Sequence, residues 1–171
     1  AAGVLADSVL RNQSAESVAR VFAPKAEGAW TLQGACARTP MSACVFFSSI
    51  SALLGGAGQA NYSAANACLD ALASARRGRS LAAASVQWGP WAEMGMASRG
   101  AAAERMAAME KESGLSRITL KQGLSALHTA VLSRSPTYMG VVQVQWPKLL
   151  GDGDVPAFLS GLAVKAAKPA A

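Results

Sequence analysis

The chain of 171 residues is 51% hydrophobic, which predicts a globular domain, or part of one, with a real core rather than a disordered segment. Its net charge of +6 comes from scattered basic residues apart from the run 76–79, and only 6% of residues are aromatic, so we expect no nucleic-acid interface. No apolar run reaches the roughly 18 residues of a membrane span, and the N-terminus lacks the features of a secretory signal. We therefore expect a soluble protein of the cytoplasm with no membrane partner.

The first predicted element is a helix over residues 14–35 that is interrupted near Pro24. Apolar residues recur at helical spacing through this segment. Proline breaks such a pattern because it lacks an N–H group and its ring clashes with the preceding turn. Lys25 is therefore predicted to lie on or beside a helical kink.

A buried strand is predicted next. The apolar run 44–50 ends in the hydroxyls of Ser48 and Ser49, and such a run is typical of a strand that is buried on both faces of a parallel sheet. Residues 52–58 are rich in glycine and predict a loop.

A strand–helix–strand unit follows from the next two elements. A long helix is predicted over 59–77 with Tyr62 and Asn66 one turn apart on the same face, and a strand over 81–88 that stops at the turn 89–90. At these lengths the unit is expected to be parallel and right-handed. Ligands of such sheets lie beyond the carboxyl ends of the strands.

The rest of the chain is expected to complete one domain, which we assign to residues 1–150. Residues 92–116 contain a short helical pattern that fits either a mobile lid or an ordinary surface helix. A helix over 120–133 and a strand over 138–146 follow. Residues 151–171 are predicted to be an interdomain linker or tail.

Cysteine and histidine usage argues against disulfides and metal. The cysteines are odd in number and show no CxxC spacing, and His128 is the only histidine. We expect small buried residues at Cys36, Cys44 and Cys68. His128 lies in an apolar helical stretch, where a packed or partly exposed side chain is the simplest interpretation, and we assign it no catalytic role.

The pair Tyr62 and Asn66, following the serine-rich strand end, indicates a site that reduces carbonyl groups. A phenol has a reference pKa of about 10, so it protonates a forming alkoxide only if a hydroxyl and a cation hold and tune it. Ser48, Ser49 and Lys25 are the candidates for those two groups. A tyrosine taken alone is more often an ordinary helix residue with its hydroxyl at the surface.

With these residues in this order, the chain resembles the catalytic half of the ketoreductase domain of a modular polyketide synthase, or the related domain of a type I fatty acid synthase. The resemblance covers residues 1 to about 150. Its motifs are Ala2-Gly3-Val4-Leu5-Ala6-Asp7, Pro24-Lys25 with Gly28-Ala29, Phe47-Ser48-Ser49, Gly58-Gln59-Ala60-Asn61-Tyr62 with Ala64-Ala65-Asn66, Leu69-Asp70, Arg76-Arg77, Trp88-Gly89-Pro90-Trp91 and Gly95-Met96. It implies an α/β fold with a Rossmann-like parallel sheet and flanking helices, a variant of the short-chain dehydrogenase/reductase fold.

The resemblance also implies a role for each candidate residue. Tyr62 is expected to donate a proton to the reduced carbonyl, and Ser49 to hydrogen-bond the substrate oxygen, while Ser48 is structural. Lys25 is expected to tune the acidity of Tyr62 and to contact the nicotinamide ribose. Asn66 is expected to support Lys25 and an ordered water. Asp70 and the arginines of 76–79 are expected to form an exposed, ion-paired helix end.

NADPH is the cofactor that the resemblance implies, with Gly3, Lys25, Tyr62, Gly89 and Pro90 as its expected contacts and no metal ion. A nicotinamide reductase needs a glycine-rich turn that holds the pyrophosphate at a helix N-terminus. The glycines of 55–58 follow the serine strand and do not fit that place. We therefore expect a fragment that lacks the first cofactor-binding βαβ units and is inactive in isolation.

Two positions are implied to set the configuration of the product. The family signature Leu-Asp-Asp corresponds here to Leu5-Ala6-Asp7, and Leu54 stands where the other subtype has tryptophan. Asp7 and Leu54 thus imply the B type, which forms a D-configured hydroxyl.

The expected activity is NADPH-dependent reduction of a β-ketoacyl group, carried on the phosphopantetheine of an acyl carrier protein, to the β-hydroxyacyl group. The partners are that carrier protein and the other synthase domains. Two alternatives remain open at this point: a non-catalytic structural fragment, and a module that docks an acidic carrier domain through its basic surface. Polyketide and fatty acid synthesis are not separated by these motifs.

Overall fold

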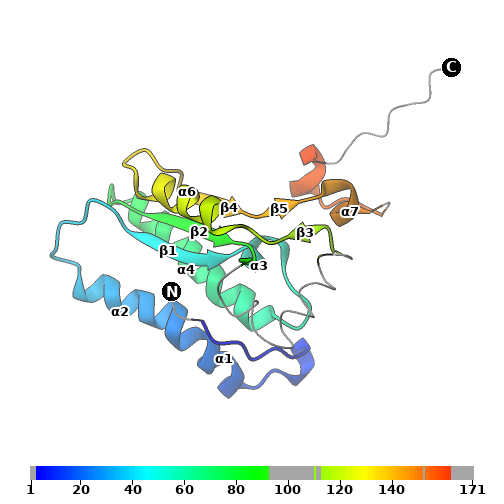
Figure 1. Ribbon diagram of the computed structural model, residues 1–171. Helices are drawn as coiled ribbons and strands as arrows, with labels where there is room; N and C mark the ends of the chain where they lie inside the picture. The colour runs from blue at the N-terminus through cyan, green and yellow to red at the C-terminus, as the bar shows by residue number, and fades with distance from the viewer. Residues whose placement is uncertain (1–2, 93–109, 111–112, 152, 163–171) are drawn as a thin grey trace. The chain divides into compact units, whose positions relative to one another are not determined.

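A computed structural model describes residues 3–92, 110, 113–151 and 153–162 (Figure 1). The chain forms two compact units, one made of residues 1–89 and 121–141 and the other of residues 90–120 and 142–171. The expected lid or surface helix within 92–116 lies largely outside the described residues. No helix within the described part of the chain is long and apolar enough to cross a membrane.

The first unit is built on a parallel three-stranded sheet in the order β1-β2-β4. The strands are β1 (Val45–Ser49), β2 (Ala84–Trp88) and β4 (Tyr138–Val141). The register pairs Val86 of β2 with Phe47 on one side and Met139 on the other. The expected α/β class with a parallel sheet is therefore confirmed.

Burial differs between the strands. Every residue of β2 is buried, whereas in β1 only Ser48 is buried and the other residues are half-buried. The prediction of a strand buried on both faces over 44–50 was thus wrong for β1. The reason is its place in the sheet, because β1 is an edge strand among the described residues and β2 is central.

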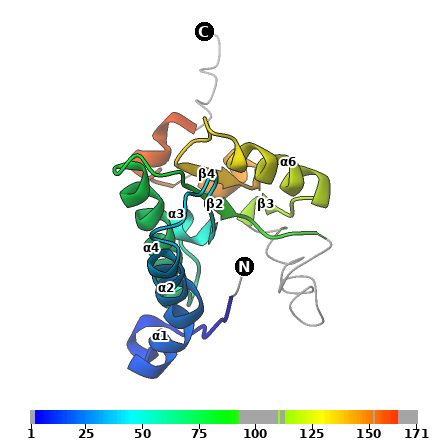
Figure 2. The same ribbon diagram turned by 90° about the vertical axis from the view of Figure 1, so that its left-hand side faces the viewer.

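Helices cover both faces of this sheet. In Figures 1 and 2, α4 (Ala60–Arg77) lies against one face with the two N-terminal helices outside it, and α6 (Leu120–Val131) lies against the other. The buried apolar side chains of α4 pack toward β1 and β2. The core of this layer comprises Val21, Ala65, Leu69, Leu72, Ala73, Ala84 and Val86.

The interruption near Pro24 is confirmed and takes the form of a π-helical turn. Helix α1 (Ala15–Phe22) begins at Ser14, whose Oγ accepts the Ser17 N–H (3.1 Å). The π turn η2 (Ala23–Glu27) follows, and α2 (Gly28–Ala35) resumes the helix. Because proline offers no N–H group, the turn widens at this point.

The loop predicted over 52–58 is partly helical. Residues Ser51–Leu54 form the short helix α3, which ends where Gly55 adopts a φ of 77°. Gly58, with φ 72°, accepts the Ser8 N–H at its carbonyl (2.8 Å) and so holds the segment that contains the 3-10 turn η1 (Leu10–Asn12). Only glycine adopts this left-handed conformation without strain.

The second unit contains a small antiparallel pair and two short helices. Strands β3 (Leu115–Ser116) and β5 (Gln143–Val144) pair with Leu115 opposite Val144. The prediction of one strand over 138–146 was therefore wrong, because β4 ends at Val141 and Trp146 begins α7 (Trp146–Leu150). Pro147, in the first turn of α7, favours this helix start. The 3-10 helix η4 (Ala157–Leu162) follows.

Asp70 joins α4 to the central strand. One carboxylate oxygen accepts the Ser85 hydroxyl (2.6 Å) and the other accepts the Gln87 amide (2.8 Å). The expectation that Asp70 belongs to an exposed, ion-paired end was thus wrong. Ser85 and Gln87 are buried polar side chains on β2, and buried polar groups need hydrogen-bond partners. Asp70 provides that partner from the facing helix.

The arginines at the end of α4 are also not solvated as expected. Arg76 donates to the Ala82 carbonyl (3.2 Å), and Arg77 donates to the carbonyls of Ala83 (2.6 Å) and Ser135 (2.7 Å). The chain turns back after α4, which brings these carbonyls over its last turn. The cysteines were predicted to be buried, but Cys68 is exposed and the other two are half-buried.

Replacing Asp70 is expected to loosen the central strand. In an Asp70→Ala variant the buried Ser85 hydroxyl loses its partner, and an unpaired buried polar group costs about 1–3 kcal/mol. Hydrogen exchange of peptides covering β2, measured in the full-length protein, should become roughly 5- to 150-fold faster. The same substitution at the exposed Asp154 serves as control, and equal exchange in the two variants would contradict this role for Asp70.

Candidate active site

Three elements of the first unit bring the predicted residues together. The π turn η2 carries Lys25, the carboxyl end of β1 carries Ser48 and Ser49, and the first turns of α4 carry Tyr62 and Asn66. Helix α4 contacts both η2 and β1. The site thus lies at the carboxyl end of a parallel strand, as the sequence predicted.

Lys25 is the most buried cation at this end of the sheet. Its side chain is 7% exposed, and its Nζ donates to the Phe47 carbonyl (3.2 Å). The same Nζ lies 5.3 Å from the centroid of the Tyr62 ring, within the range of a cation–π contact. The structure therefore brings Lys25 and Tyr62 together, although 37 positions separate them in the sequence.

Burial sets the electrostatics of Lys25. Removal from water disfavours the ammonium and lowers the pKa of Lys25, while the negative charge of Asp70 acts in the opposite direction. An ammonium has three donors and only one of them is used by the Phe47 carbonyl. The remaining donors can serve a ligand hydroxyl.

Asn66 ties the strand to the helix. It is fully buried, its amide donates to the Tyr62 carbonyl (2.8 Å), and its own backbone carbonyl accepts the Ser48 hydroxyl (3.2 Å). Its Oδ1 is buried and has no hydrogen-bond partner in the described part of the chain. A buried acceptor without a partner favours a donor such as an ordered water or an ammonium.

The two serines differ in what their hydroxyls do. Ser48 is buried, and its hydroxyl donates to the Asn66 backbone carbonyl, which is a structural contact. Ser49 is half-buried, and its Oγ accepts both the N–H (3.2 Å) and the hydroxyl (3.0 Å) of Ser51. With its acceptor positions filled, the Ser49 hydroxyl is left to donate. No hydrogen bond joins Ser49 to Tyr62 or Lys25 among the described residues.

Asn61 anchors the segment that precedes the helices. Its amide donates to the Ala6 carbonyl (2.9 Å) and to Gln13 Oε1 (3.1 Å), and its Oδ1 accepts the Tyr62 N–H (2.7 Å). The sequence analysis assigned no role to Asn61. The signal was present, because asparagine at a helix start commonly satisfies a free N–H group.

The residues expected to set product configuration lie near this anchor. Asp7 is exposed, and its carboxylate accepts the side-chain amide of Gln59 (3.2 Å) just before α4 begins. Leu54 is the half-buried last residue of α3. Asp7 thus contacts the residue that precedes α4, and Leu54 ends the short helix before it in the chain.

The remaining expected cofactor contacts are backbone positions. Gly3 lies in an irregular, half-exposed segment. Gly89 is buried at the carboxyl end of β2 and donates its N–H to the Val141 carbonyl (2.8 Å). Pro90 belongs to the second unit, where its carbonyl accepts the Ile118 N–H (2.8 Å).

Known proteins resemble this chain in sequence. The family model described as "KR domain" matches residues 1–93. Polyketide synthase GfsB of Streptomyces halstedii is 45% identical over 148 residues, which are 86% of this chain and 3% of that protein. The chain therefore spans a small part of the curated relatives it matches.

Solved structures extend the likeness to three dimensions. A ketoreductase from the first module of phoslactomycin biosynthesis in Streptomyces sp. HK803 has a TM-score of 0.76 at 40% identity, over 88% of this chain and 34% of that one. A structure titled as A-type ketoreductases from a modular polyketide synthase has a TM-score of 0.79 at 31% identity, over 87% and 30%. These likenesses confirm the resemblance drawn from the sequence and the predicted fold class.

The pKa of Lys25 provides a direct test of the site electrostatics. Competitive acetylation across a pH series, read by mass spectrometry, should give a midpoint for Lys25 below the ordinary lysine value of 10.5. Since the Asp70 charge supports the ammonium, Asp70→Asn should lower that midpoint further. The lowered pKa also has a consequence for stability. Because the folded state binds this proton less tightly than the unfolded state, the free energy of unfolding, relative to that of a Lys25→Met variant, should rise as the pH increases toward 10.5. An Asp70→Asn midpoint equal to or above that of the unchanged protein would contradict this electrostatic coupling.

Proposed function

This chain belongs to the KR domain family, and we propose that it supplies the substrate-activating half of an NADPH-dependent β-ketoacyl reductase of polyketide synthesis. The observation that carries the proposal is the buried Lys25 ammonium against the Tyr62 ring, at the carboxyl end of β1. Burying an ammonium is unfavourable unless its charge is used or paired. A non-catalytic scaffold has no need of it.

The chemistry is the addition of a hydride and a proton across a ketone. When bound beside Lys25, NADPH would supply the hydride that this addition needs. The Tyr62 hydroxyl donates its proton to the carbonyl oxygen as negative charge develops there, which yields the β-hydroxyl group. The tyrosine is then reprotonated from water.

Lys25 stabilises the negative charge that this proton transfer leaves on Tyr62. A cation close to a phenolate favours the ionised form, and the interaction is stronger where water is excluded. The hydrogen bond to the Phe47 carbonyl holds the ammonium beside the ring. Position matters because a charge that is already oriented needs no rearrangement during the reaction.

Ser49 is the proposed hydrogen-bond donor to the substrate oxygen. The two bonds that it accepts from Ser51 orient its Oγ and leave its proton available. Ser51 is therefore a positioning residue in this proposal, acting through Ser49. A fixed donor aimed at the developing oxyanion lowers the barrier.

The side chains of Lys25 and Asn66 have hydrogen-bonding groups that suit a nicotinamide cofactor. The unused donors of Lys25 suit ribose hydroxyls, and the buried Oδ1 of Asn66 can receive an ordered water that links to the amine. Gly3, Gly89 and Pro90 are proposed as further contacts. The pyrophosphate turn falls to the remainder of the reductase domain.

The proposed substrate is a β-ketoacyl chain on the phosphopantetheine of an acyl carrier protein, reduced in the cytoplasm among the other synthase domains. This assignment draws on the relatives that are named as polyketide synthases. The use of NADPH and the B type belong to the same proposal.

Removing the phenol is expected to abolish turnover. In the full-length protein, Tyr62→Phe should lower kcat by roughly 10²- to 10⁴-fold, the usual contribution of a general acid. NADPH oxidation with a β-ketoacyl thioester is the assay. Tyr138→Phe is the matched control because Tyr138 is exposed on β4, and it should leave kcat unchanged. A Tyr62→Phe variant with full activity would sink the proposal.

The product configuration tests the roles of Asp7 and Leu54. Chiral chromatography of the hydroxyacyl product should show the D configuration. An Asp7→Ala variant should form a less pure product while retaining turnover, because Asp7 is not among the reacting groups. An L-configured product from the unchanged protein would show that the B-type assignment is wrong.

A further inference from the structure

A second feature of the first unit is a buried arginine with no acidic partner. Arg76, near the end of α4, is 6% exposed, and the one hydrogen bond of its side chain among the described residues is donated to the neutral carbonyl of Ala82 (3.2 Å). The only ion pair among the described residues joins Arg117 to Glu110 elsewhere. An arginine is always charged, and a buried charge is costly unless an opposite charge meets it.

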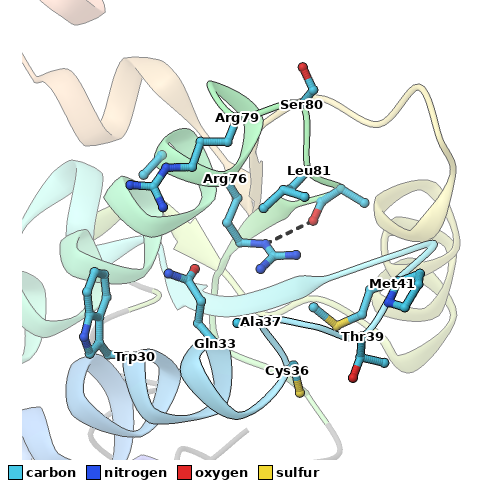
Figure 3. A pocket seen from close by; sticks show the side chains of 13 residues that line it. Trp30, Gln33, Cys36, Ala37, Thr39, Met41, Arg76, Arg79, Ser80 and Leu81 are labelled. Atoms are coloured by element: carbon cyan, nitrogen blue, oxygen red, sulfur yellow. Dashed lines mark hydrogen bonds between the residues drawn. The ribbon is translucent and has the colours of Figure 1, made fainter.

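Arg76 borders a cavity of about 440 Å³ between α2 and the end of α4, which we call the arginine cavity. Figure 3 shows its guanidinium in the middle of the cavity, with Gln33 pointing up from α2. Arg79 lines the same space, and its guanidinium makes no hydrogen bond or ion pair within the described chain. No aspartate or glutamate lines the cavity, so two cations face it without a counter-ion.

The backbone after α4 is bent to form this wall. Ser80 adopts a φ of 57°, the only positive value of a non-glycine residue in the described chain. Such a conformation is uncommon for serine and persists only where surrounding contacts hold it. It turns the chain so that Arg79 and Leu81 both line the cavity.

The rest of the lining selects among anionic ligands. Gln33 Oε1 is buried and has no partner among the described residues, so it favours an N–H donor. Trp30 is 66% exposed at the edge of the cavity. An exposed indole beside two cations and a free acceptor favours a peptide, which offers a carboxylate, a backbone N–H and an apolar side chain together, over a small inorganic ion.

We infer that the arginine cavity is a docking site for an acidic protein segment. A carboxylate of that segment pairs with Arg76 and Arg79, a backbone N–H donates to Gln33, and a neighbouring apolar side chain packs on Trp30. A planar guanidinium matches a carboxylate with two parallel hydrogen bonds. The positive charges of Arg76 and Arg79 thus call for an occupant that carries carboxylates.

The arginine cavity and the proposed active site lie at opposite ends of the same strands. The segment 36–41 precedes β1 and Ala82 precedes β2, whereas Ser49 is the last residue of β1 and Gly89 follows β2. A protein segment docked in the cavity therefore leaves the carboxyl ends free. The inference stands on different residues from the proposed function, and either can fail without the other.

A fluorescent peptide of sequence Gly-Leu-Asp-Glu-Leu-Gly, with Gly-Leu-Asn-Gln-Leu-Gly as its neutral counterpart, is the first probe. Titrated with the full-length protein and followed by anisotropy, only the acidic peptide should bind. Arg79→Ala should weaken binding by roughly 10-fold, and so should added salt, since charge-assisted bonds are lost or screened. Arg11→Ala is the matched control because Arg11 is exposed on η1, and it should bind as the unchanged protein does.

Carbodiimide coupling in an Arg79→Lys variant reports which carboxylate lies next to position 79. It therefore also detects a cavity that is already filled by another part of the full-length protein. The introduced amine should form an amide with an aspartate or glutamate, located by mass spectrometry, and Arg11→Lys should not. Coupling to the peptide supports the inference. Absence of both coupling and peptide binding overturns it, as does coupling to a carboxylate anywhere in the same polypeptide or stronger displacement of the peptide by inorganic phosphate than by acetate. Because Arg79 is exposed, its substitution leaves the fold intact even where replacing Arg76 would not.

Discussion

The candidate site depends on one ammonium held out of water beside one aromatic ring. Lys25 lies beside Tyr62 because the π turn at Pro24 carries it on the side facing α4, and because its Nζ donates a hydrogen bond to the Phe47 carbonyl on β1. Asn66 then joins β1 to α4 from the other side through Ser48. Three elements are thus fixed to one another by hydrogen bonds that all pass through or beside the site. Burial makes the charge unfavourable in the resting fold, and the same burial strengthens its action on a developing phenolate.

Sequence reasoning predicted the local elements better than the contacts between them. The break at Pro24, the helix that carries Tyr62 and the central strand followed from proline chemistry and from apolar spacing, which act within a few residues. The edge position of β1, by contrast, depends on which strands pair, and the end of β4 at Val141 depends on Pro147 starting a new helix. Neither can be derived from a local pattern.

The site residues divide in the same way. Tyr62, Asn66 and the serines were predicted from their types and spacing, and Lys25 was one candidate cation that the family resemblance then selected. Asp70, Asn61 and Ser51 were missed because their roles are defined by what lies opposite them: β2 side chains, the carbonyl of Ala6 and the Ser49 Oγ. Arg76 was misjudged for a related reason, since an arginine near a helix end is usually solvated, and only the returning chain at Ala82 buries it.

The π turn at η2 has a consequence for how this segment can vary. A π turn holds about one residue more than an α-turn. The side chains that follow it are therefore rotated around the helix axis by close to 100° relative to their positions in an uninterrupted α-helix. Inward-facing residues therefore recur at Val21, Lys25, Ala29 and Gln33, every fourth position rather than every 3.6. Deleting any single residue between Phe22 and Gly28 would restore a regular α-helix and rotate α2 relative to α1, whichever residue was removed. Apart from Pro24 and Lys25, the number of residues along this stretch is constrained more tightly than their identity, so homologues should tolerate exchanges at the other positions far more readily than gaps.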